Sequence, residues 1–220
     1  MKRIFIILFF AFLVIPVANA QQWPFFDEVQ AYRKQDSISV PPRNAILFIG
    51  SSSFRLWKNM QDDFPGYTII NRGLGGSSLP DIIHYADEMI FAYKPKQIII
   101  YCGDNDLAAS DTVTAETVVK RFGDLFELIR NRKPGIPVVY VSIKPSPSRE
   151  RLLPAMMLAN KTIKEFLKTK PHTAFADVFS EMMSSDGKIR TDIFLEDKLH
   201  MNAKGYAIWI KTITPYLLKD

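Results

Sequence analysis

Short, apolar, β-rich runs alternate with amphipathic helical stretches from residue 45 to the end of this 220-residue chain. Each run is four to eight residues long, is mostly β-branched or aromatic, and is bounded by Pro, Gly, Asn or Asp. Runs of this kind are typical of strands that are buried on both faces of a parallel sheet. We therefore expect five strands, at 45–49, 67–70, 97–101, 136–143 and 173–177.

Helices are expected at 24–36, 52–63, 80–93, 114–132, 150–169 and 203–218. The stretch at 114–132 shows the helical period best, because its apolar residues recur at three- and four-residue steps. Pro80 stands where a first-turn proline is expected for the helix at 80–93. Pro134 and Gly135 end the helix at 114–132. The alternation predicts right-handed βαβ crossovers and an α/β fold, a three-layer α/β/α sandwich around a five-stranded parallel sheet.

The first twenty residues have the pattern of a secretory signal peptide. Lys2 and Arg3 precede an apolar run at 4–17, and Ala18-Asn19-Ala20 is a small-x-small cleavage site. The run of about 14 residues is shorter than the roughly 20 that a membrane-spanning helix needs, although an uncleaved anchor is the alternative. We expect residues 21–220 to form one exported domain, periplasmic or extracellular in a bacterium, with no stable membrane insertion after cleavage.

The composition excludes several classes of protein. With 47% hydrophobic, 12% aromatic and 23% charged residues, the chain can form a packed core and is not disordered. The single cysteine, Cys102, excludes an internal disulfide and a Cys-rich zinc site. The 28 Lys and Arg residues are scattered among 23 acidic ones without a basic stripe, so we expect no nucleic-acid partner.

Residues that carry chemistry should follow the strands, because ligands bind beyond the carboxyl ends of a parallel sheet. The first strand is followed by Gly50-Ser51-Ser52-Ser53. A serine at a helix start lies near free backbone N–H groups, which suits a nucleophile and equally suits an N-cap. The Gly-x-Ser-x-Gly elbow is absent, which disfavours the α/β-hydrolases.

The next two strands end in a glycine-rich segment and in an asparagine. Gly73-Leu74-Gly75-Gly76 allows backbone N–H groups to approach an anion, and Asn105 can donate to an oxyanion. A tight turn and an Asx-turn are the alternatives for these two features. The glycine patterns of dinucleotide and phosphate loops are incomplete, which disfavours a nucleotide-binding module.

Near the C-terminus, Asp197 stands three residues before His200. At this spacing a carboxylate can reach the imidazole Nδ1–H and fix the tautomer, leaving Nε2 for a serine hydroxyl. His84 and His172 lack such a partner, so we expect them to be structural or solvated.

These four blocks, in this order over about residues 45 to 206, resemble the SGNH hydrolases, also called the GDSL esterase/lipase superfamily. The resemblance implies a flavodoxin-like fold and a serine esterase that needs no metal or organic cofactor. It assigns the catalytic roles to Ser52, His200 and Asp197, and the oxyanion hole to the backbone N–H groups of Ser52 and Gly76 with the Asn105 side chain. Ser51 stands where the family has an aspartate that is not a triad member.

The spacing Asn71-x-Gly-x-Gly-Gly is most similar to a subgroup with platelet-activating-factor acetylhydrolase-like and bacterial carbohydrate-ester enzymes. That similarity implies a short acyl group on a small ester, an acylated sugar or lipid. Lysophospholipase, arylesterase and thioesterase activity on the same site are alternatives, as is a non-catalytic envelope protein that binds sugar. Phe54, Leu56, Trp57 and Met156-Met157 could line an acyl pocket or belong to the core, and residues 146–149 could shape the substrate entrance.

Overall fold

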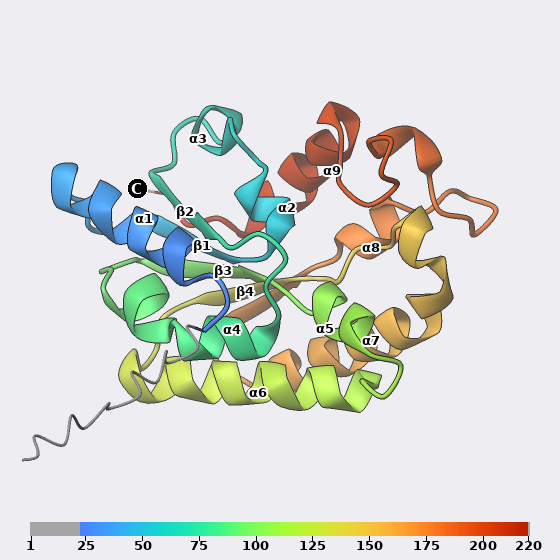
Figure 1. The fold of residues 1–220 in the computed structure, drawn as a ribbon, viewed down its shortest axis with the longest axis horizontal. Helices are drawn as coiled ribbons and strands as arrows, with labels where there is room; N and C mark the ends of the chain where they lie inside the picture. The colour runs from blue at the N-terminus through green and yellow to red at the C-terminus, as the bar shows by residue number, and fades with distance from the viewer. Residues whose placement is uncertain (1–22, 220) are drawn as a thin grey trace, which may run out of the picture.

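The computed structural model describes residues 23–219, so the predicted signal peptide lies outside the described residues (Figure 1). Five parallel strands form one sheet in the order β2-β1-β3-β4-β5. This order is the flavodoxin-like one, and the predicted α/β fold with a five-stranded parallel sheet is confirmed. The strands are β1 Ile46–Gly50, β2 Ile69–Gly73, β3 Gln97–Tyr101, β4 Val138–Val141 and β5 Thr173–Ala176.

Helices cover both faces of the sheet (Figure 1). The α-helices are α1 Phe26–Ile38, α2 Ser52–Arg55, α3 Met60–Asp63, α4 Leu79–His84, α5 Asp104–Ala109, α6 Ala115–Arg132, α7 Leu153–Lys168, α8 Val178–Glu181 and α9 Ala203–Ile213. A π-helical turn, η1 Asp87–Phe91, follows α4, and the 3₁₀ segments are η2 Pro147–Leu152, η3 Thr191–Ile193 and η4 Thr214–Tyr216.

The helix expected at 114–132 forms as α6, but the single helix expected at 52–63 is wrong. It is divided into α2 and α3 by a turn that contains Trp57. The Trp57 indole is buried beside Phe64, and its Nε1 donates to Asp63 Oδ2 at 2.6 Å. Burying this ring takes the chain away from the axis of α2. The helix expected at 80–93 is likewise divided, into α4 and η1.

Alternate residues of the central strands pack into two separate cores. Ile49 of β1 and Ile100 of β3 face α4, α6 and α7, whereas Phe48 of β1 and Tyr101 of β3 face α2 and α9. Every residue of β1, β3 and β4 is buried, as expected for a parallel sheet that is covered on both sides.

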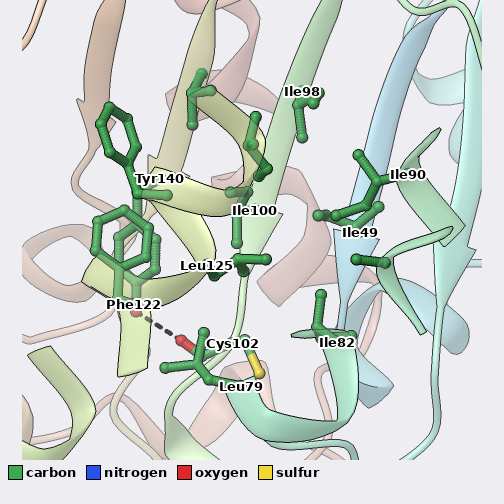
Figure 2. Packing of buried hydrophobic residues seen from close by; sticks show 14 of the residues in the cluster. Ile49, Leu79, Ile82, Ile90, Ile98, Ile100, Cys102, Phe122, Leu125 and Tyr140 are labelled. Atoms are coloured by element: carbon green, nitrogen blue, oxygen red, sulfur yellow. Dashed lines mark hydrogen bonds between the residues drawn. The ribbon is translucent and has the colours of Figure 1, made fainter. Parts of the chain in front are cut away.

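Figure 2 shows the core under α4 and α6, where Leu125 of α6 lies beside Ile100 and the Phe122 ring packs on Tyr140, with 4.6 Å between ring centroids. In this core the Tyr140 hydroxyl of β4 donates to the Cys102 carbonyl at 2.6 Å. Cys102 is fully buried, and burial raises the pKa of its thiol well above the usual range. This contact fixes the segment that leaves β3 toward Asn105.

The residues considered for an acyl pocket divide between core and surface. Phe54, Trp57 and Met156 are buried in the two cores, while Leu56 and Met157 are exposed. The first three therefore serve packing. Within residues 23–219, no helix has both the length and the apolar character to cross a membrane.

Candidate active site

The carboxyl end of β1 turns sharply at Gly50, which lies directly beside Tyr101 of β3. Gly50 has φ +145°, and a Cβ at this position would lie 1.8 Å from the Tyr101 carbonyl oxygen, so only glycine fits. The same carbonyl accepts from Ser51 N–H at 3.0 Å. Ser51 is extended as the N-cap residue, and Ser52 is the first residue of α2.

Ser52, His200 and Asp197 form a continuous chain of hydrogen bonds. Ser52 Oγ lies 3.0 Å from His200 Nε2, across 148 residues of sequence. His200 Nδ1 lies 2.5 Å from Asp197 Oδ2, and the other carboxylate oxygen accepts from the N–H groups of Leu199 and His200 at 2.9 Å each. The structure thus brings together the three side chains to which the family resemblance assigned catalysis.

The Asp197 carboxylate is held in its ionised form. Burial opposes ionisation, but the hydrogen bonds from the His200 and Leu199 backbones and from the His200 ring together lower the pKa of Asp197 to about 2. An ionised carboxylate opposite Nδ1 favours the tautomer that carries its proton there. Nε2 is then left as an acceptor facing Ser52 Oγ.

Of the three consecutive serines, only Ser52 contacts His200. Ser51 and Ser53 are buried, with exposed fractions of 0% and 3%, whereas Ser52 is partly open to solvent. Ser51 Oγ makes no hydrogen bond within the described part of the chain. The serine in place of the family aspartate therefore adds no side-chain partner to Ser52.

The residues predicted for the oxyanion hole lie on segments that follow β1, β2 and β3 and that hydrogen bonds connect to one another. Gly76 is exposed with φ +87°, and nothing lies within 4 Å of the place of a Cβ. Asn105, in the first turn of α5, donates from Nδ2 to the Ser77 carbonyl at 2.9 Å. Ser77 Oγ lies 3.3 Å from the Gly50 carbonyl, so the segments that follow β1, β2 and β3 are joined at this edge.

Three charged residues, Arg149, Asp104 and Lys144, lie beside this site, and the sequence analysis assigned a role to none of them individually, although Arg149 belongs to the stretch 146–149 considered for the substrate entrance. Arg149 donates to Asn105 Oδ1 at 2.8 Å and to Asp104 Oδ2 at 2.9 Å. Lys144 is almost fully buried and donates from Nζ to the Leu199 carbonyl at 2.8 Å. Desolvation lowers the pKa of Lys144 to about 8, against the opposing effect of Asp104. No local sequence pattern signals these contacts.

The two remaining histidines lie elsewhere. His84 is exposed and stacks on Trp23 with 4.2 Å between ring centroids, and His172 is exposed in a turn with φ +56°. Neither belongs to a metal-ligating group, since residues 23–219 contain no cluster of three or more His, Cys, Asp or Glu placed to hold an ion.

Comparisons with known proteins agree with this architecture. Similar solved structures include a candidate platelet activating factor from Streptococcus pneumonia, 23% identical, with TM-score 0.74 over 87% of this chain and 92% of that one. They also include a GDSL-like lipase from Bacteroides thetaiotaomicron, 20% identical, with TM-score 0.72 over 85% and 95%. A third is an acetylxylan esterase from Geobacillus stearothermophilus, 14% identical, with TM-score 0.64 over 80% and 95%.

No curated protein matches this sequence. The GDSL-like Lipase/Acylhydrolase family model matches residues 36–208, which include all of the strands and the whole of the Ser52, His200 and Asp197 chain. The chain therefore belongs to the GDSL-like lipase/acylhydrolase family of SGNH hydrolases and is a carboxylic ester hydrolase.

Proposed function

We propose that this protein is an exported serine esterase that removes short acyl groups from small esters through an acyl-enzyme on Ser52. The observation that carries the proposal is the hydrogen-bond chain from Ser52 Oγ through His200 to Asp197, at 3.0 and 2.5 Å. This arrangement has the geometry that serine acyl transfer requires.

In the proposed reaction, Ser52 Oγ attacks the ester carbonyl while His200 Nε2 takes the hydroxyl proton. The charge that develops on the carbonyl oxygen is held by the N–H groups of Ser52 and Gly76 and by the Asn105 amide. His200 then gives its proton to the leaving alcohol. Water, activated by the same imidazole, releases the acid and restores Ser52.

The substrate class we propose is an O-acetylated carbohydrate. An acetylxylan esterase and a carbohydrate esterase from Talaromyces cellulolyticus share this fold, with 14% and 16% identity. Export follows from the signal-peptide pattern at residues 1–20. It predicts that the secreted or periplasmic protein begins near Gln21, which N-terminal sequencing of the recovered protein tests; a chain recovered inside the cell with residues 1–20 intact contradicts it.

The direct test is p-nitrophenyl acetate hydrolysis by the chain from Gln21 and by its Ser52→Ala variant. Ser51→Ala is the matched control, because Ser51 Oγ is buried and has no hydrogen-bond partner among residues 23–219. We expect Ser52→Ala to lose turnover and Ser51→Ala to retain it, with unchanged circular dichroism in both. Full ester hydrolysis by Ser52→Ala would refute the assignment.

Substrate specificity is tested separately. A panel of acetylated xylo-oligosaccharides, lysophospholipid, aryl esters and thioesters distinguishes the proposed acetyl esterase from other acyl specificities on the same site. A fluorophosphonate probe should label Ser52 in the unmodified chain and not in Ser52→Ala. Sugar binding without labelling would instead indicate a non-catalytic protein.

A further inference from the structure

The segment that follows β4 contacts both the proposed oxyanion hole, at Asn105, and the loop that carries Asp197 and His200. Arg149, in η2, reaches Asn105, which belongs to the proposed oxyanion hole. The backbone N–H of Ser148 donates to the Lys198 carbonyl at 3.1 Å, between Asp197 and His200. Lys144 Nζ donates to the carbonyl of Leu199. This segment is outside the four sequence blocks; its residues 146–149 were considered only for the substrate entrance, and the contacts with Asn105 and with residues 198 and 199 come from the structure.

The Arg149 guanidinium fixes which end of the Asn105 amide faces it. Arginine has five N–H donors and no acceptor, so the Asn105 group within 2.8 Å of Nη2 must be the carbonyl oxygen. The amide nitrogen therefore points the other way. One of its two hydrogens is used by the Ser77 carbonyl, and the second stays available to an oxyanion.

The guanidinium is itself held in place by Asp104. Its Nη1 donates to Asp104 Oδ2 at 2.9 Å, so the two ends of one planar group bind consecutive residues of the chain. The Arg149 side chain is only 16% exposed and that of Asp104 only 5%. A charge-assisted hydrogen bond in so buried a place is strong, and it polarises the Asn105 amide toward better donation.

We infer that Arg149 is the positioning residue of the oxyanion hole: it sets the orientation of the Asn105 amide and, through that amide alone, stabilises the transition state of ester cleavage. The inference rests on the proposed acyl-enzyme mechanism. Within residues 23–219, the Arg149 side chain makes hydrogen bonds to Asp104 and Asn105 and none to Ser52 or His200, so its link to the reacting groups runs through Asn105.

The test is a double-mutant cycle on p-nitrophenyl acetate. Arg149→Met and Arg149→Lys are each made in the unmodified chain and in Asn105→Ala. Loss of one oxyanion donor costs about 100- to 1000-fold in kcat, so misorienting it should cost about 10- to 100-fold, with KM nearly unchanged. In the Asn105→Ala background the same substitutions should change kcat little.

Two features of the design protect the test from a folding artefact. Arg149→Met leaves the buried Asp104 carboxylate unpaired and could unfold the protein, whereas Arg149→Lys keeps a positive charge there without the planar fork. Arg151→Met is the matched control, because Arg151 lies in η2 like Arg149, and among residues 23–219 its side chain pairs with the exposed Asp111, away from the site. It should leave kcat unchanged.

A second readout separates positioning from a purely structural role. A boronic acid that forms a tetrahedral adduct with Ser52 should bind the Arg149→Lys variant more weakly, in proportion to the loss of kcat, while the melting temperature stays the same. Equal losses of kcat in both backgrounds, or full kcat in Arg149→Lys, would overturn the inference. Full activity of Ser52→Ala would instead refute the proposed function, whatever the Arg149 variants do.

Discussion

Replacing Lys144 by Met should make the protein more stable and less active. Lys144 is 1% exposed, and its ammonium donates to the Leu199 carbonyl, next to His200. Methionine has a similar length and flexibility without the charge, so it can occupy the same space. The substitution thus removes the cost of a buried charge together with one contact that holds the catalytic histidine loop.

The magnitude follows from the pKa of Lys144. Desolvation lowers that pKa from 10.5 to about 8, with Asp104 and Asp197 opposing the change and Arg149 adding to it. A difference of this size corresponds to about 3 kcal/mol of destabilisation while the group is charged. The Leu199 carbonyl, left without its donor, costs about 1 kcal/mol. We therefore expect a net gain near 2 kcal/mol in the free energy of unfolding at pH 7.

The pH dependence gives a sharper result than the value at one pH. Between pH 8 and 10.5 the unfolded chain still binds the Lys144 proton that the folded protein has released, so Lys144 makes wild-type stability rise with pH in this window. Below pH 8 the folded wild-type protein carries the charged Lys144, so the full destabilisation from burying that charge is present. Burial of Cys102 and Tyr101 raises their pKa values and lowers stability in alkali, but it does so in both proteins.

The assay is urea denaturation of both proteins from pH 7 to 10.5, together with ester hydrolysis at pH 7. At pH 7 the free energy of unfolding of Lys144→Met should exceed that of wild type by about 2 kcal/mol, whereas at pH 10.5 it should be about 1 kcal/mol lower than that of wild type. The kcat of the variant should fall about tenfold, because a small displacement of a catalytic group is costly. A variant less stable than wild type at pH 7, or a stability difference that does not change with pH, would refute the reasoning.

Two other substitutions test the geometry of the β1 end and of the triad. Gly50→Ala places a methyl group 1.8 Å from the Tyr101 carbonyl and should cost more than about 4 kcal/mol or prevent folding, whereas Gly123→Ala in α6, with open space at the Cβ, should add about 1 kcal/mol. Thermal denaturation measures both, and equal melting temperatures would contradict the expectation. Asp197→Asn keeps an acceptor for the Leu199 and His200 N–H groups but loses the charge opposite Nδ1, so kcat should fall about 1000- to 10,000-fold with an unchanged circular dichroism spectrum. A kcat near that of wild type would exclude Asp197 from catalysis.

Most of the strands and α6 could be predicted because burial gives each of them a local pattern of apolar residues, a continuous run in a strand and a helical period in α6. β3 forms at 97–101, where it was expected, since every one of its residues is buried between two helical layers. β2 was placed too early, at 67–70 instead of 69–73, because it contains Arg72. Arg72 is buried through contacts with Asp36 and with the Tyr93 hydroxyl, and no strand pattern shows partners so distant in the sequence.

The residues of the site likewise differ in whether their partners are near or distant in the sequence. Asp197 and His200 stand three residues apart, so their pairing has a signature that a single segment displays. Arg149 lies 44 residues from Asn105, and Lys144 lies 55 from Leu199. A charged residue after a strand is normally expected to be exposed to solvent. Arg149 and Lys144 become part of the site because the segment after β4 packs against α5 and the 197–200 loop.

The choice among Ser51, Ser52 and Ser53 has a physical cause that lies in the sheet rather than in the serines. β1 and β3 approach so closely at Gly50 and Tyr101 that only glycine fits, and the Tyr101 carbonyl then binds Ser51 N–H. That bond holds Ser51 extended and buried, so the helix must begin at Ser52. Because the first residue of the helix is also the one that faces His200, the strand packing that requires Gly50 selects Ser52 as the residue able to act as nucleophile.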